Sequence, residues 1–280
     1  MRVGNGGNNN YWGAPFTAGG LFQMCDGSVR TINYTLSGSG SLVGGGTFTK
    51  TGSSSFIINT KGTSLGAVSV NNGSVQLGTG TGLATVTSLS VGSNATFDVN
   101  NNHVIIDYGS GPDPIASIAA LLKTGYNHGN WSGVGGIDSS AAALNAGYGL
   151  GYADSADTGN PANLASGTIE IKYTLLGDSN LSGVVDGTDF GVVAANFNKG
   201  VSRWDQGDFN YDNTVDGTDF GDLAANFNKG ASGAAAWQAV VNFAAANGLL
   251  ADVPEPGSIA LLAIGATALA ARRRRSMSAN

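Results

Sequence analysis

Two stretches of the sequence, residues 178–189 and 208–219, carry oxygen-bearing side chains at the spacing of a calcium-binding loop. In a twelve-residue loop of this kind, positions 1, 3, 5, 9 and 12 supply side-chain or water-mediated ligands, and position 7 supplies its backbone carbonyl. The predicted ligands are Asp178, Asn180, Ser182, Val184, Asp186 and Asp189 in the first loop, and Asp208, Asn210, Asp212, Thr214, Asp216 and Asp219 in the second. Ca²⁺ prefers about 6–8 oxygen ligands, so the sequence predicts two bound calcium ions, one in each loop.

The two loops belong to a duplicated unit, because the string DGTDF begins at Asp186 and again at Asp216. Position 6 of each loop needs a positive φ, which Gly183 adopts freely and Asn213 tolerates. An apolar stripe follows each loop and predicts a helix. The stripes are Phe190, Val193, Ala194 and Phe197 in the first copy, and Phe220, Leu223, Ala224 and Phe227 in the second. We expect the two helices to pack on each other.

A duplicated loop that ends in Asp and precedes a helix resembles the type I dockerin module, over about residues 175–230. The resemblance implies a small α-helical EF-hand-like pair. In dockerins, loop positions 10 and 11 and the following helix contact a cohesin. Here those positions are Gly187-Thr188 and Gly217-Thr218, and small alanines stand in the helices where many dockerins carry bulkier or basic residues. The resemblance therefore implies that the same loop positions bind calcium here, and binding to a cohesin-like partner is kept as an alternative function.

Residues 41–108 alternate between apolar and polar side chains with a period of two, which predicts short β-strands. The apolar pairs are Val68/Val70, Val75/Leu77, Leu89/Val91, Phe97/Val99 and Val104/Ile106, separated by Asn-Gly, Gly-Ser and Gly-Thr turns. Such strands suit a β-solenoid, although an antiparallel sandwich shows the same alternation. The phrase GGGTFTKTGSSSFIINT, followed by GAVSVNNGSVQLG, resembles the autotransporter-associated β-strand repeat of bacterial surface proteins. That resemblance implies a right-handed parallel β-helix.

These patterns predict a mainly β N-terminal part followed by a helical part. We expect an irregular segment with a hairpin at Asp26-Gly27 in residues 1–40, where a short string resembles the end of pilin-like secretory proteins and no signal peptide is visible. The other predicted divisions are a solenoid at 41–112, a helix with a linker or capping segment at 113–174, the dockerin-like domain at 175–230, a helix at 231–251 and a tail at 252–280.

The tail contains a Pro-Glu-Pro motif, then an apolar segment, then a cluster of arginines. The residues are Pro254, Glu255, Pro256, Arg272, Arg273, Arg274 and Arg275. This order resembles the PEP-CTERM sorting signal. The resemblance implies export, processing by an exosortase-like enzyme and transient anchoring through a C-terminal transmembrane helix. By the positive-inside rule, the arginines place the C-terminus in the cytoplasm before processing.

Composition narrows the function classes. Charged residues make up 11% of the chain and the net charge is −6, so no basic face for nucleic acid is expected. The two glutamates are Glu170 and Glu255, and no acid–base pair stands out, so we expect no enzyme activity. We therefore expect an exported calcium-binding surface protein with a structural, adhesive or docking role. The alternatives are a cohesin-binding subunit of a polysaccharide-degrading assembly and a β-helix polysaccharide-active enzyme, and a surface polysaccharide is a further candidate partner.

Overall fold

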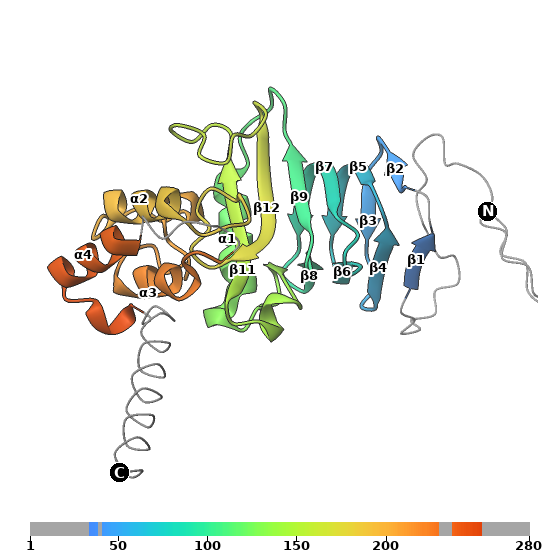
Figure 1. Cartoon of the computed structure of the whole chain (residues 1–280). Coiled ribbons are helices and arrows are strands. Elements are labelled where there is room, and N and C mark those ends of the chain that lie inside the picture. Colours follow the sequence, from blue (N-terminus) through green and yellow to red (C-terminus); the bar gives the residue numbers. More distant parts are fainter. Residues whose placement is uncertain (1–33, 39–40, 230–236, 254–280) are drawn as a thin grey trace, which may run out of the picture.

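The computed structural model describes residues 34–38, 41–229 and 237–253, which run from a stack of β-strands into a group of short helices (Figure 1). Two sheets form the stack. The first contains, in spatial order, β1 (Tyr34–Gly38), β4 (Ser55–Thr60), β6 (Gly73–Leu77), β8 (Ala95–Asp98) and β10 (Ile137–Asp138). The second contains β11 (Tyr148–Asp154), β12 (Thr168–Leu175), β9 (His103–Asp107), β7 (Leu83–Val91), β5 (Thr63–Val70) and β2 (Val43–Gly44), while β3 (Phe48–Lys50) also pairs with β5.

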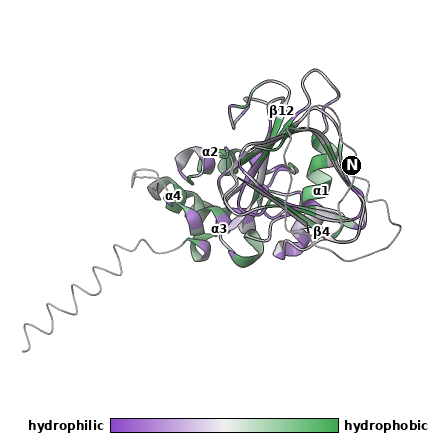
Figure 2. Cartoon of the chain, turned by 90° about the vertical axis from the view of Figure 1, so that its right-hand side faces the viewer, coloured by the Kyte–Doolittle hydropathy of each residue, from purple (hydrophilic) through white to green (hydrophobic). Residues whose placement is uncertain are grey.

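The strands up to β10 pair in parallel and form a β-solenoid. Gly44, Leu65, Val86 and Ile106 are partners in successive registers of the second sheet, so each turn takes about 20 residues, as in other solenoid repeats. Viewed along the stack, the turns superimpose as one outline (Figure 2). The predicted β-solenoid is thereby confirmed, and the antiparallel sandwich is wrong for these strands.

The interior of the solenoid is the apolar face that the alternating pattern predicts. Among the predicted apolar pairs, the side chains with at most 8% of their surface exposed are Val68, Val70, Val75, Leu77, Leu89, Phe97, Val99, Val104 and Ile106, while Val91 is partly buried. Equivalent positions stack from turn to turn, as Val75 does on Phe97 and Val68 on Leu89. Each such burial contributes about 1.5–3 kcal/mol, so the ladder of apolar side chains holds the turns together.

The solenoid ends where the chain reverses direction. β12 pairs antiparallel with β9, and β11 pairs antiparallel with β12. Helix α1 (Ile115–Tyr126) packs on β10, and the Ile115 N–H at its start donates to the Asp113 carboxylate at 2.8 Å. The helix continues into a 3₁₀ turn, η1 (Asn127–Gly129). These elements cover the last turn of the stack and provide the platform for the helices that follow.

The helical part consists of α2 (Gly187–Asn196), α3 (Gly217–Asn226) and α4 (Trp237–Asn247), with 3₁₀ turns η2 (Ala142–Leu144), η3 (Trp204–Gln206) and η4 (Leu250–Asp252). The two predicted apolar stripes both pack against a side chain of α4. The Phe243 ring lies 5.5 Å from Phe190, 5.1 Å from Phe197 and 5.4 Å from Phe220, between ring centroids. The sequence pattern predicted α2 and α3 as mutual partners, and the structure adds α4 as a third wall of their core.

Two predictions lie largely outside the described residues: the hairpin at Asp26-Gly27 and the C-terminal transmembrane helix. Within the described ranges, each helix is too short or too polar to cross a membrane.

A carboxyl pair at the first sheet leads to a prediction about pH. Asp138 is the register partner of Asp98, and its Oδ1 atom is buried without a hydrogen-bond partner among the described residues. Burial, and then the charge of Asp98, raise the pKa of Asp138 to about 7. An unfolded Asp titrates near about 3.9, so ionised Asp138 opposes folding above pH 7 and this cost disappears by about pH 4. We expect Asp138→Asn to raise the free energy of unfolding by about 4 kcal/mol at pH 8 and to leave it nearly unchanged at pH 4.

Urea unfolding at the two pH values measures this difference, and Asp107→Asn at the exposed end of β9 is the matched control. An equal gain for Asp138→Asn at both pH values would show that charge burial is not the cause.

Candidate metal centre

The two predicted calcium loops lie at equivalent places in the fold, each immediately before a helix. Residues 178–189 connect the end of β12 to the first turn of α2, and residues 208–219 connect η3 to the first turn of α3. Both loops lie on the side of the helical group next to β11 and β12 (Figure 1). The duplicated sequence has thus produced two loop–helix units.

The first aspartate of each loop accepts two hydrogen bonds from backbone N–H groups further along the loop. Asp178 accepts from Ser182 and Gly183 at 2.9 Å each. Asp208 accepts from the corresponding residues, Asp212 at 3.2 Å and Asn213 at 2.9 Å. Asp178 also accepts a hydrogen bond from the Thr174 hydroxyl. In both copies, the loop backbone therefore folds around the carboxylate of the first aspartate.

The last aspartate of each loop closes it. Asp189 accepts from the backbone N–H of Ser179 at 2.9 Å and of Asn180 at 3.3 Å, and its other oxygen accepts from Asp186 at 2.9 Å. Asp219 repeats the pattern with Phe209 at 2.8 Å, Asn210 at 3.4 Å and Asp216 at 2.9 Å.

Asp186 and Asp216 also act as helix N-caps. Each accepts from the N–H of the threonine two residues later, Thr188 at 2.8 Å and Thr218 at 2.7 Å. With Asp189 and Asp219 at the third helical position, each helix has a capping box.

The remaining predicted ligands occupy the rim of each loop. Asn180 and Asn210 each accept from the N–H of the residue at position 5, at 3.0 Å and 2.9 Å. Asp212 accepts from the N–H of Thr214 at 2.9 Å, while the Ser182 hydroxyl lies 3.3 Å from the Val184 carbonyl. Asn180 and Asn210 are partly buried and Ser182 and Asp212 are exposed, so these oxygens face the solvent side of loops whose first and last carboxylates are buried.

The backbone of the loops has the positive φ angles that the turns need. Gly183 has a φ of 87° and Asn213 a φ of 74°, as predicted for position 6. The sequence analysis missed a second such position. Leu181 and Tyr211, both at position 4, have φ angles of 57° and 59°. A positive φ is uncommon for bulky residues, so the surrounding contacts must hold these two side chains in place.

Position 4 attaches both loops to the end of the solenoid. Tyr211 is buried, and its hydroxyl donates to the Leu150 carbonyl of β11. Leu181 is buried too, and its carbonyl accepts from the Lys172 ammonium of β12. A bulky side chain at position 4 of both loops was the sequence signal for these anchors.

Trp204 completes the junction between the loops and the solenoid. Its side chain is fully buried, and its indole N–H donates to the backbone carbonyl of Asp178 at 2.8 Å. It lies against Gly149 and Gly151 of β11, where an added Cβ would come within 3.1 Å and 2.6 Å of the indole. The ring also meets Phe209 edge-on, with centroids 5.1 Å apart. The calcium-loop region and the strand pair therefore share one core.

The buried carboxylates carry an electrostatic cost. Burial raises the pKa of Asp178, that of Asp189 to about 6, that of Asp208 to about 6 and that of Asp219 to about 7. The ion pairs in the described part of the chain, His103–Glu170 and Arg203–Asp157, involve none of these four groups. A cation between the loop oxygens would supply the missing positive charge.

The fit to calcium rests on oxygen chemistry and loop spacing. Within the described ranges, no three His, Cys, Asp or Glu side chains converge on one point as a ready-made metal cluster. The donor set of each loop mixes carboxylate, amide, hydroxyl and backbone oxygens, which is the hard-ligand chemistry that Ca²⁺ prefers. The residues therefore fit calcium in type and order, while the carboxylates at positions 1 and 12 hold loop N–H groups.

The sorting residues Pro254, Glu255 and Pro256 and the arginines 272–275 lie outside the described residues. Comparison with curated proteins and with solved structures finds no match. Comparison with protein families finds one: residues 252–275 match the PEP-CTERM protein-sorting motif. The chain thus carries, after its solenoid and helical parts, the C-terminal signal of a bacterial protein that is exported and sorted by an exosortase.

Proposed function

We propose that this protein is an exported cell-surface or extracellular protein in which two calcium ions stiffen the end of a β-solenoid, with a structural or adhesive role. The observation that carries the proposal is the repeated frame around two pairs of buried aspartates, Asp178 with Asp189 and Asp208 with Asp219. Two copies of one hydrogen-bonding pattern, with the same residue types at loop positions 1, 3, 9 and 12, support a shared ligand.

The sorting motif supports the location. A protein that carries the signal in residues 252–275 passes through the membrane before an exosortase processes it, with the apolar segment as a transient anchor. Extracellular calcium is abundant enough for modules with weak affinity, with Kd values of about 10⁻⁴–10⁻³ M, to stay loaded. The location and the metal therefore agree with each other.

The loops differ in charge. The second loop has four carboxylates, Asp208, Asp212, Asp216 and Asp219, whereas the first has three, Asp178, Asp186 and Asp189. Ligand charge helps to set calcium affinity, so the second loop is the tighter site in this proposal. Asn213 in place of glycine at position 6 works against that advantage, because non-glycine residues adopt a positive φ at a cost.

A docking role is the second candidate, and α2 is the helix that favours it. Gly191 on α2 has open space around it, and Thr188 at its start is exposed. The equivalent face of α3 is partly covered, because a Cβ on Gly217 would lie 3.0 Å from Leu249 and one on Gly221 would lie 3.8 Å from Asp252. A cohesin-like partner would therefore bind through the first loop–helix unit.

Calorimetric titration of the full chain with Ca²⁺ tests the calcium proposal. We expect two ions per chain. Asp208→Asn with Asp219→Asn should abolish the tighter site, and Asp178→Asn with Asp189→Asn should abolish the weaker one. Asparagine keeps the size of aspartate and one of the two oxygens that accept loop N–H groups, so each substitution removes the charge and one acceptor with little change of shape.

Mg²⁺ at equal concentration should substitute poorly, because it dehydrates reluctantly and requires a near-ideal octahedron. The absence of heat with Ca²⁺, or equal heats for the wild type and both double variants, would reject the metal sites.

A further inference from the structure

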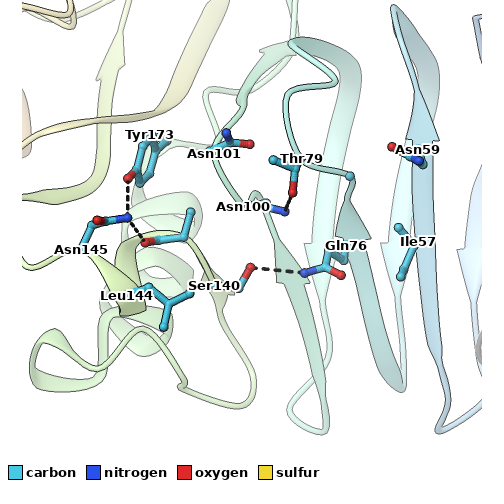
Figure 3. A pocket seen from close by; sticks show the side chains of 12 residues that line it. Ile57, Asn59, Gln76, Thr79, Asn100, Asn101, Ser140, Leu144, Asn145 and Tyr173 are labelled. Atoms are coloured by element: carbon cyan, nitrogen blue, oxygen red, sulfur yellow. Dashed lines mark hydrogen bonds between the residues drawn. The ribbon is translucent and has the colours of Figure 1, made fainter.

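A hollow of about 770 Å³ lies on one side of the solenoid and is open to solvent (Figure 3). Three consecutive turns contribute amide side chains to it: Asn59 from β4, Gln76 from β6 and Asn100 from the chain after β8. The segment around η2 closes one end with Asn145, and Tyr173 of β12 forms the adjoining wall. The hollow therefore follows the stack of turns.

The amide groups that line this hollow are held in fixed orientations. Gln76 donates through its Nε2 to the buried carboxylate of Asp98 at 2.5 Å and to the Ser140 hydroxyl at 3.2 Å. Asn100 donates through its Nδ2 to the Leu77 carbonyl and to the Thr79 hydroxyl, both at 3.2 Å. Each donor end is engaged, so the carbonyl oxygens of Gln76 and Asn100 are left as acceptors.

The other end of the hollow repeats the arrangement. Asn145 donates to the Ala141 carbonyl at 3.1 Å and to the Tyr173 hydroxyl at 3.4 Å, which leaves its Oδ1 atom as an acceptor. Asn101 accepts from the N–H of Gly80 at 2.8 Å and keeps its amide donor for other partners. The described contacts leave the exposed Asn59 side chain with both donor and acceptor available.

The lining also offers a flat apolar surface. Tyr173 stacks on Tyr148, with ring centroids 4.8 Å apart and planes 4° from parallel. Leu144 also lines the hollow, with 85% of its surface exposed. None of the lining side chains is charged. The nearby carboxylate of Asp98 is buried behind Gln76 and does not line the hollow.

We propose that this hollow binds a neutral oligosaccharide segment of a longer polysaccharide. A sugar hydroxyl donates one hydrogen bond and accepts others, which matches fixed amide acceptors mixed with free amide donors. Gln76 pairs in register with Ile57 and Asp98, so Asn59 and Asn100 each lie two residues further along their turns than Gln76. The three amides therefore form a staggered set that a ligand with repeating hydroxyl groups can contact at several points. Fixed side chains lose little conformational entropy on binding, and the tyrosine and leucine surface suits the C–H face of a sugar ring. An acidic polymer finds no cation in the lining.

This inference does not depend on calcium, and it deepens the adhesive role by naming what the surface would hold. Calorimetric titration of the full chain in calcium-containing buffer uses four probes: maltohexaose, cellohexaose, mannohexaose and, as the acidic comparison, hexagalacturonate. We expect at least one neutral hexasaccharide to bind with a Kd of about 0.1–1 mM, and hexagalacturonate to bind at least about ten times more weakly.

Substitutions at exposed positions test the site itself. Asn59→Ala combined with Asn145→Ala should weaken the neutral ligand about ten-fold, because two hydrogen-bonding groups contribute about 1.4 kcal/mol together. Asn94→Ala, an exposed amide at the opposite end of β8, is the matched control and should leave the affinity unchanged.

Three outcomes would overturn the proposal: no heat from any neutral probe, equal affinity for hexagalacturonate, or unchanged affinity in the double variant. The same variants titrated with Ca²⁺ should behave like the wild type, so failure of the sugar site and failure of the metal sites are distinguished.

Discussion

Removal of calcium is expected to lower the melting temperature of the full chain by about 10–20 °C. At a free concentration 100 times its Kd, one ion adds about 2.7 kcal/mol, so two independent ions add about 5 kcal/mol. A change of 1 kcal/mol moves the melting temperature by about 2–4 °C for domains of 150–250 residues. The four buried carboxylates at loop positions 1 and 12 make the loss large, because without the ions their charges lie in a shared core.

Differential scanning calorimetry in Ca²⁺ and in chelator measures this shift. Asp208→Asn with Asp219→Asn should lose about half of it, while Asp252→Asn, an exposed acid outside the loops, should keep all of it. A melting temperature that is the same in calcium and in chelator would contradict both the metal sites and their coupling to the fold.

Replacement of Trp204 by Ala is expected to lower the free energy of unfolding by about 3–5 kcal/mol, the usual cost of deleting a large buried aromatic side chain. The indole is fully buried between the glycines of β11 and the first calcium loop, and it donates to the Asp178 carbonyl. The first loop should also lose calcium affinity, because that hydrogen bond holds its first ligand residue.

Trp204→Phe separates the two contributions. Phenylalanine keeps most of the packing and lacks the N–H donor, so the loss of calcium affinity should persist while most of the stability returns. Gly151→Ala is an independent check, since its Cβ would approach both the indole and Leu181 within 2.6 Å. Urea unfolding with calcium titration reports both effects. A Trp204→Ala variant with wild-type stability would contradict the stabilising role of Trp204 at the junction.

Much of the local structure was predictable because its cause is local. The period-two alternation identified the residues that face the solenoid interior, and the apolar stripes after the two loops predicted α2 and α3. The same aspartates that were predicted as ligands also cap the helices, a second role that follows from the capping-box pattern.

The rest depends on contacts between distant residues. The reversal at β12 is set by pairing with β9, more than 60 residues earlier, and no alternation pattern distinguishes a parallel from an antiparallel strand. Trp204 belongs to a loop in sequence, and its burial follows from glycines at positions 149 and 151. The amide-lined hollow is equally non-local, because Gln76 takes its orientation from Asp98 and Ser140.

Because β12 closes one end of the stack by antiparallel pairing, further parallel turns can be added only at the other end. At the closed end, the strand pair and the helices occupy the positions that a further parallel turn would need. At the other end of the described stack, β1 and β2 are the outermost strands of their sheets. Tandem duplication of a segment of about 20 residues can therefore lengthen the rod by about 4.8 Å per copy without disturbing the cap. Natural variation in length within this architecture should accumulate on the N-terminal side, where each added turn would lengthen the molecule.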